Sequence, residues 1–177
     1  MHVTPSIQLE PLDNKHAAPF FRIVEESRAY LREWLPWVDF MLSADHFDLF
    51  IQGAKRRTEQ KMEVSYAIVF EGEVVGRIGL FYIHEHNKIA SIGYWIGQQY
   101  QGKGIITASC KKLITYGFNI LGLNRIEIKC GVGNSKSTAI PERLGFTREG
   151  IIRQGELVNN EFIDLYLYSV LKEEWEG

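Results

Sequence analysis

The feature that most restricts the fold is a change of pattern between residues 89 and 130. Residues 89–96 are mostly apolar and predict a strand, and a glycine-rich turn follows at once. Residues 106–121 place apolar side chains on one helical face, and residues 125–130 alternate apolar and charged side chains as a second strand. Strand, helix and strand in this order predict a parallel pair joined by a right-handed crossover.

The chain on either side of this unit predicts further strands and helices. Residues 64–96 are β-rich with turns at 71–72 and 84–88, a pattern that indicates an antiparallel meander. Because no repeat or linker interrupts the sequence, we expect one domain over residues 1–177, of the α/β class, with a mixed sheet and the crossover at its centre. The other expected elements are a strand at 7–12, helices at about 16–27, 43–62 and 135–144, and strands near 148–157 and 162–171.

Composition excludes several classes of function. The formal net charge is -2, so no general basic field is present to attract nucleic acid. No apolar run approaches the roughly 20 residues that span a bilayer, and the first residues lack the features of an export signal. We therefore expect a cytoplasmic protein without a membrane or nucleic-acid partner, in which Cys110 and Cys130 are reduced, buried thiols rather than nucleophiles.

The turn that contains Gly102 and Gly104 is suited to binding an anion. Glycine lets the backbone come close to a ligand, and the first amides of the following helix have no partner inside that helix. The glycine spacing alone is equally compatible with a turn that binds nothing. A nucleotide P-loop is disfavoured because Gly104 stands where a Ser or Thr would hold magnesium, and a dinucleotide-binding turn is disfavoured because Thr107 replaces its third glycine.

Two further motifs accompany the pattern Gln99-x-x-Gly102-x-Gly104. Asn134 follows the second crossover strand, and Leu144-Gly145-Phe146 closes the short helix after it. Together these residues resemble the GNAT superfamily of acetyl-CoA-dependent N-acetyltransferases, and within it the RimJ/RimL type that acetylates the N-termini of ribosomal proteins. The resemblance covers nearly the whole chain. Its other parts are Trp34-Leu35-Pro36-Trp37, Gly93-Tyr94-Trp95-Ile96, Asn134-x-x-Ser137 and Glu149-Gly150.

The resemblance implies a GNAT fold whose central turn holds the pyrophosphate of acetyl-CoA through main-chain amides. It also implies an N–H donor to the reaction's oxyanion near Ile96, where the central strand diverges from its neighbour. Many family members carry a tyrosine as general acid in the helix after the asparagine; this helix has none, and Ser137 matches the serine that contacts the sulfur in the resembling group. No metal is expected, because His84 and His86 have no third ligand. The implied cofactor contacts are Ile96, Gln99, Gln101, Gly102, Lys103, Gly104, Ile105, Thr107, Asn134 and Ser137.

Acetyl transfer to an amine needs a neutral nitrogen and a proton acceptor. A peptide α-amino group has a pKa of about 8, so one carboxylate suffices as general base and contributes about 10²- to 10⁴-fold. The resemblance places this base at Glu156, a position that also suits an ordinary exposed strand residue. Trp34, Trp37 and Tyr94 form a candidate substrate cleft, although the two tryptophans are equally compatible with core positions.

These observations predict an N-acetyltransferase that acts on the N-terminal α-amine of a ribosomal or other protein. One alternative is the same chemistry on a small amine, such as a polyamine or an aminoglycoside, and a polyamine would need a pocket dense in carboxylates. Another is a non-catalytic acyl-CoA-binding module, in which Glu156 and Ser137 would point away from the sulfur. The resembling group also implies a homo-oligomer, at least a dimer.

Overall fold

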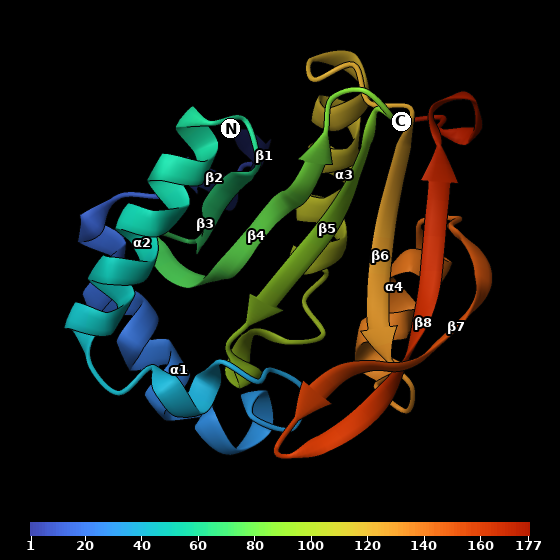
Figure 1. The fold of residues 1–177 in the computed structure, drawn as a ribbon. Helices are drawn as coiled ribbons and strands as arrows, with labels where there is room; N and C mark the ends of the chain where they lie inside the picture. The colour runs from blue at the N-terminus through green and yellow to red at the C-terminus, as the bar shows by residue number, and fades with distance from the viewer.

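The computed structural model describes residues 1–177, and one mixed sheet runs through them (Figure 1). Its strands are β1 (His2–Thr4), β2 (Ile7–Pro11), β3 (Val64–Phe70), β4 (Glu73–His84), β5 (Ile89–Ile96), β6 (Arg125–Gly131), β7 (Thr147–Val158) and β8 (Glu161–Leu171). The α-helices are α1 (Ala17–Leu31), α2 (Ala44–Glu59), α3 (Ile105–Asn119) and α4 (Ser135–Arg143). Short 3-10 turns lie at Asn14–His16, Val38–Phe40, Gln98–Tyr100 and Lys172–Glu174.

The spatial order of the strands is β1-β2-β3-β4-β5-β6-β8-β7. The predicted meander is confirmed, because β2 to β5 pair antiparallel in chain order. The predicted crossover is confirmed as well, because β5 pairs in parallel with β6 through α3. The sequence did not indicate β1, which spans 3 residues and only extends the edge of the sheet.

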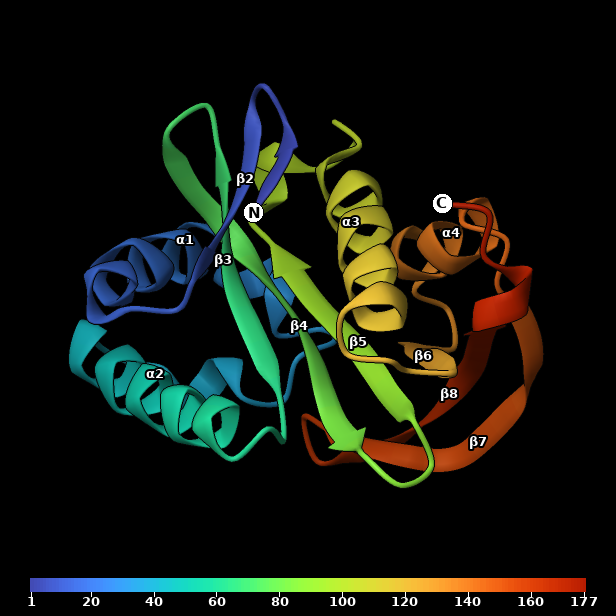
Figure 2. The ribbon, with the colours of Figure 1, turned by 90° about the horizontal axis from the view of Figure 1, so that it is seen from above.

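Helices cover both faces of the sheet and form two cores (Figure 2). On one face α3 packs apolar side chains, among them Cys110 and Leu113, against the strands. On the other face α1 and α2 bury Phe20 and Ile51 together with Trp95 of β5. Each fully buried side chain of this size contributes roughly 1.5–3 kcal/mol, so these two layers hold the sheet from both sides. No helix is both long and apolar enough to cross a membrane.

The parallel strands β5 and β6 pair over only part of their length. Their pairing stops at Ile92 and Ile128, whereas β5 stays paired with β4, and β6 with β8, to their ends. The second halves of β5 and β6 therefore separate, as Figure 1 shows. Because Gly97 donates to a carbonyl of β4, the alternation of an antiparallel ladder turns the main-chain groups of Tyr94 and Ile96 toward the opening. The divergence expected near Ile96 is confirmed.

The outer strand β7 buries few side chains and is tied to the sheet by an ion pair. The two terminal nitrogens of Arg125 on β6 donate to both oxygens of Glu149 on β7, at 2.6 and 2.7 Å. Ser169 on β8 donates to the same carboxylate at 2.7 Å. Arg125 first, and then Ser169, lower the pKa of Glu149 from 4.5 to about 2. One carboxylate thus links three strands.

We predict that this link makes the stability of the fold depend on acid pH. Because the pKa of Glu149 is lower in the folded chain than its ordinary value of 4.5, its contribution is complete above that value and disappears as the pH falls toward 2. Glu149→Gln should therefore lower the free energy of unfolding at pH 7, and the gap from the wild type should narrow between about pH 5 and pH 2. Urea unfolding across this range measures the gap, and a gap independent of pH would contradict the interpretation.

Candidate active site

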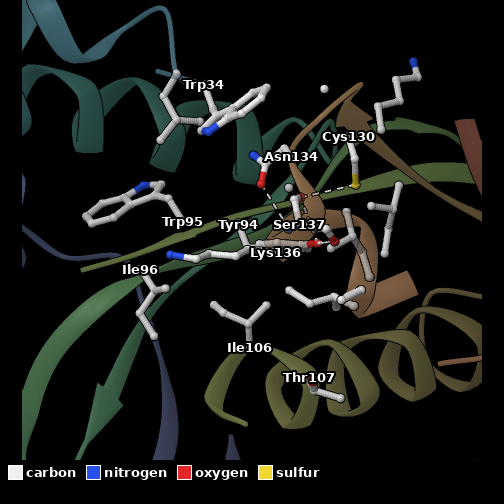
Figure 3. Close-up of a pocket in the computed structure, with 18 of the residues that line it drawn as sticks. Trp34, Tyr94, Trp95, Ile96, Ile106, Thr107, Cys130, Asn134, Lys136 and Ser137 are labelled. Atoms are coloured by element: carbon white, nitrogen blue, oxygen red, sulfur yellow. Dashed lines mark hydrogen bonds between the residues drawn. The ribbon is translucent and has the colours of Figure 1, made fainter. Parts of the chain in front are cut away.

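A cavity of about 1580 Å³ occupies the opening between β5 and β6. Its walls come from the end of α1, the loop before α2, strands β4 to β6, the first turns of α3 and α4, and the β7–β8 hairpin. Figure 3 shows part of this lining as sticks. Most predicted site residues line it: Trp34, Trp37, Tyr94, Ile96, Gln101, Gly102, Gly104, Ile105, Thr107, Asn134, Ser137 and Glu156. Gln99 and Lys103 do not line it.

The glycine-rich turn presents a row of free backbone amides. Gly102 and Gly104 both have φ +73°, a left-handed conformation that glycine adopts without a steric penalty. The first bond of the helical ladder runs from Ala108 to the carbonyl of Gly104, and no side chain caps α3. None of the amides from Gly102 to Thr107 donates to another protein group. The turn therefore combines free N–H donors with the positive end of a helix dipole, and this arrangement is suited to binding a phosphate.

The side chains of Gln99 and Lys103 contact other residues of the protein. Gln99 donates from Nε2 to Glu26 of α1 at 2.9 Å. The ammonium of Lys103 lies 5.5 Å from the ring centre of Phe70 and 5.4 Å from that of Tyr100. The predicted contacts of Gln99 and Lys103 with a cofactor stay predictions.

The start of α4 brings a serine hydroxyl to the cavity. Asn134 caps the helix, because its Oδ1 accepts from the amide of Ser137 at 3.1 Å. The hydroxyl of Ser137 donates to the sulfur of Cys130 at 3.2 Å, and Figure 3 marks both bonds. Tyr94 approaches from β5: its hydroxyl donates to the carbonyl of Ser137 at 3.2 Å and lies 3.5 Å from the serine Oγ. Tyr94 thus points toward α4, not toward the tryptophans with which the sequence grouped it.

Burial keeps this cluster in its neutral, proton-donating form. Desolvation raises the pKa of Tyr94 well above its ordinary value and the pKa of Cys130 to about 11. Cys110 is also buried, and desolvation raises its pKa. The prediction of buried cysteines is therefore confirmed, and neither thiol ionises near neutral pH, as a nucleophile would have to. The hydroxyls of Tyr94 and Ser137 remain donors.

Glu156 reaches the cavity from an irregular part of the hairpin. The register between β7 and β8 shifts between Ile152 and Glu156, where Gln154 has φ +50° and donates from its amide to the carboxylate of Asp164 at 2.8 Å. Such a bulge changes the direction of the side chains after it. The carboxylate of Glu156 is half-buried, has no hydrogen-bond or ion-pair partner, and has its pKa raised by desolvation. A carboxylate in this state is a better proton acceptor than a surface one.

Trp34 and Trp37, which precede α2, line the cavity and also pack against other parts of the protein. A Cβ on Gly131 would lie 2.8 Å from the indole of Trp34, so the ring is seated on the end of β6 and requires a glycine there. Trp37 packs edge-on or tilted against two aromatic rings of the α1–α2 core. Nearby, Asn159 at the hairpin tip donates to the carbonyl of Arg32 at 2.8 Å. The α1–α2 segment therefore contacts both β6 and the hairpin across the opening.

Basic residues outnumber acidic residues in the lining of the cavity. Glu156 is the one carboxylate in its lining. Arg77 of β4 is one of the cations, and sequence reasoning missed it, because a lone arginine in an alternating strand is typical of a solvent-exposed position. The five basic residues that line the cavity are Arg77, Lys111, Lys129, Lys136 and Arg143.

Comparisons with known proteins agree with this geometry. A family model described as an acetyltransferase (GNAT) domain matches residues 6–147. The chain is 40% identical over 176 residues to the protein named "Putative ribosomal N-acetyltransferase YdaF" of Bacillus subtilis (strain 168), covering 99% of this chain and 96% of that protein. It is 30% identical to the ribosomal-protein-serine acetyltransferase of Escherichia coli (strain K12), covering 94% and 93%.

A solved structure of RimL, a ribosomal L7/L12 alpha-N-protein acetyltransferase in complex with coenzyme A, is similar over 96% of each chain with a TM-score of 0.92 and 29% identity. The turn with free amides and the adjoining cavity of this chain fit such a donor, because a pyrophosphate accepts from backbone N–H groups. The chain therefore belongs to the GNAT family of N-acetyltransferases, and acetyl-CoA is its acetyl donor.

Proposed function

We propose that this enzyme acetylates the N-terminal α-amine of a ribosomal protein, with Glu156 as general base. The observation that carries the proposal is the placement of Glu156: a half-buried carboxylate without a partner lines the same cavity as the free amides of the turn and the hydroxyl of Ser137. The relatives named as ribosomal-protein acetyltransferases support the choice of acceptor. The expected cytoplasmic location and homo-oligomer stay predictions.

Acetyl-CoA supplies an activated thioester, and the protein groups supply position and charge stabilisation. The amides from Gly102 to Thr107 hold the donor's phosphates. The N–H of Ile96, turned toward the opening, donates to the oxygen that gains negative charge during the attack. Removing one such donor typically costs about 10²- to 10³-fold in rate.

The reaction exchanges one bond for another. The neutral amine forms a C–N bond to the acetyl carbon, and the C–S bond breaks. The amine proton passes to Glu156, whose raised pKa suits it to accept a proton and later release it to water. The leaving thiolate keeps the bonding electrons and takes a hydrogen bond from Ser137, whose hydroxyl otherwise donates to Cys130.

The charge of the cavity bears on the two alternatives. A polyamine would bring several positive charges to a lining with five basic residues and one carboxylate, which is unfavourable. A peptide α-amine brings one charge that it must lose before reaction. The non-catalytic alternative requires Glu156 and Ser137 to face away from the donor, and their shared cavity favours catalysis instead.

We predict that the left-handed conformation of Gly104 is needed for donor binding. Gly104→Ala adds a Cβ that meets no atom within 4 Å, so its effect is strain at φ +73°, roughly 1–2 kcal/mol, relieved by turning the amides away. Affinity for coenzyme A, measured by calorimetry, should fall about 5- to 30-fold.

Gly122 offers a matched control, because it has φ +66° and equally open surroundings outside the cavity. Gly122→Ala should lower the unfolding temperature about as much as Gly104→Ala does, because the backbone strain is similar. It should leave affinity for coenzyme A unchanged. Equal affinities in the two variants would contradict the role of the turn.

We predict that Glu156→Gln lowers kcat by about 10²- to 10⁴-fold and leaves affinity for coenzyme A unchanged, because it removes the proton acceptor and no phosphate contact. Glu161→Gln is the control, since Glu161 is an exposed acid of the same hairpin outside the cavity. The measurement is thiol release between pH 6 and 9. Unaltered turnover of Glu156→Gln over that range would remove this residue from the mechanism.

We predict that the acceptor is a peptide N-terminus and not a polyamine. A peptide with a free α-amine should be acetylated at least tenfold more efficiently than spermidine, and the same peptide with a blocked N-terminus should be inert even if it contains lysine. Mass spectrometry of the products locates the acetyl group. Faster acetylation of spermidine, or modification of the lysine, would support the small-amine alternative.

A further inference from the structure

Arg77 is a cavity residue for which the acetyl transfer described above has no use. It lies on β4 directly opposite Trp95 of β5, and paired residues project from the same face of a sheet. That face carries the α1–α2 core, where Trp37 packs against Trp95. The free amides of the turn belong to the opposite side of the opening, at the start of α3. Arg77 therefore lines the part of the cavity that remains for the acceptor.

The guanidinium of Arg77 is fixed in place but incompletely bonded. Its carbon lies 4.6 Å from the ring centre of Phe50 and 4.7 Å from that of Phe81, so two aromatic rings hold it. Nη2 donates to Ser65 at 2.8 Å and to Glu63 at 3.4 Å. The buried Nε has no partner, and Nη1 has none either although it is accessible. Nη1 is therefore a charged donor that a ligand can reach, whereas Nε is enclosed by the protein.

The charges around Arg77 do not balance. Glu63, which is 4% exposed, is its one carboxylate partner. Arg57 occupies the other oxygen of that carboxylate at 2.5 Å, closer than Arg77 at 3.4 Å. Two guanidinium groups therefore share one negative charge. Burial lowers the pKa of Arg77 to about 10, so the group is still protonated at neutral pH. Arg57, Arg77 and Glu63 together therefore carry a net positive charge.

The surface beside Arg77 is formed by an aromatic ring packed over two glycines. Gly79 and Gly93 face each other on β4 and β5, and a Cβ on either would touch the ring of Phe81. The ring of Phe81 consequently lies flat across two positions without side chains. Phe81, Ser91 and Gly93 all line the same cavity as Arg77.

We propose that Arg77 binds an acidic side chain close to the N-terminus of the protein acceptor, and so makes this enzyme selective for acidic N-terminal sequences. The inference rests on the proposed function, because it assumes that a peptide occupies the acceptor side of the cavity. A carboxylate would accept a charge-assisted hydrogen bond from Nη1, the terminal nitrogen that has no protein partner. It would also neutralise the excess charge of the pair formed with Arg57.

The test is a set of peptides with a free α-amine that differ at one residue. Aspartate, asparagine or lysine is placed in turn at the second, third and fourth positions, and kcat/KM is measured with saturating acetyl-CoA. At one of these positions aspartate should exceed asparagine by about 10- to 100-fold, mainly through KM, with lysine lowest. In Arg77→Gln this preference should disappear, so that the aspartate and asparagine peptides give equal kcat/KM values.

Arg57→Gln is the matched control, because it removes the other guanidinium from Glu63 and lies outside the cavity. It should weaken the preference for aspartate without abolishing it, because Glu63 then neutralises Arg77 more fully while Nη1 stays free. If Arg77→Gln does not fold, the wild-type enzyme still decides the question: its preference for aspartate should shrink as the salt concentration rises, since an accessible ion pair is screened.

The outcomes separate this inference from the proposed function. Acetylation of all peptides at equal rates by the wild type would overturn the role of Arg77 and leave the peptide acceptor intact. A preference that persists in Arg77→Gln would also overturn it. Acetylation of no peptide, together with turnover of another amine, would overturn the proposed function itself.

Discussion

The early end of the pairing between β5 and β6 is the constraint on which the rest of the structure depends. Two parallel strands that pair only as far as Ile92 and Ile128 leave unbonded main-chain groups inside a sheet, which is costly unless a ligand or water satisfies them. The strands can separate because each remains bonded to its outer neighbour, β4 or β8. The cavity and the free main-chain N–H of Ile96, the proposed oxyanion donor, follow from that separation.

The two sides of the opening use different chemistry. On the side proposed for the donor, the backbone conformation leaves the amides of Gly102 to Thr107 free, while the side chains of Gln99 and Lys103 contact Glu26 and the ring of Phe70. On the side proposed for the acceptor, the cavity presents individual side chains such as Arg77 and Glu156. Members of one family can therefore share a donor and differ in acceptor.

This division also explains how much the sequence could predict. Glycines with positive φ and a helix cap leave local signatures, and so the turn, Asn134 and the crossover were predicted correctly. The direction of Tyr94 depends on which face of β5 meets α4, and the importance of Arg77 depends on its pairing with Trp95. Those relations join distant segments and leave no periodicity in the sequence. Only the resemblance to a family pointed to Glu156.

The acceptor side stores two opposite and incompletely satisfied charges. The pKa of Glu156 is raised, so the fold loses stability as the pH rises past the ordinary carboxyl value; the pKa of Arg77 is lowered, so its protonation also opposes folding. Neither group would be selected for stability alone. Two contacts, Trp34 on Gly131 and Asn159 on Arg32, connect the walls of the opening despite these costs. The proposed acceptor would satisfy both groups, because it would bring a proton to Glu156 and a negative charge to Arg77.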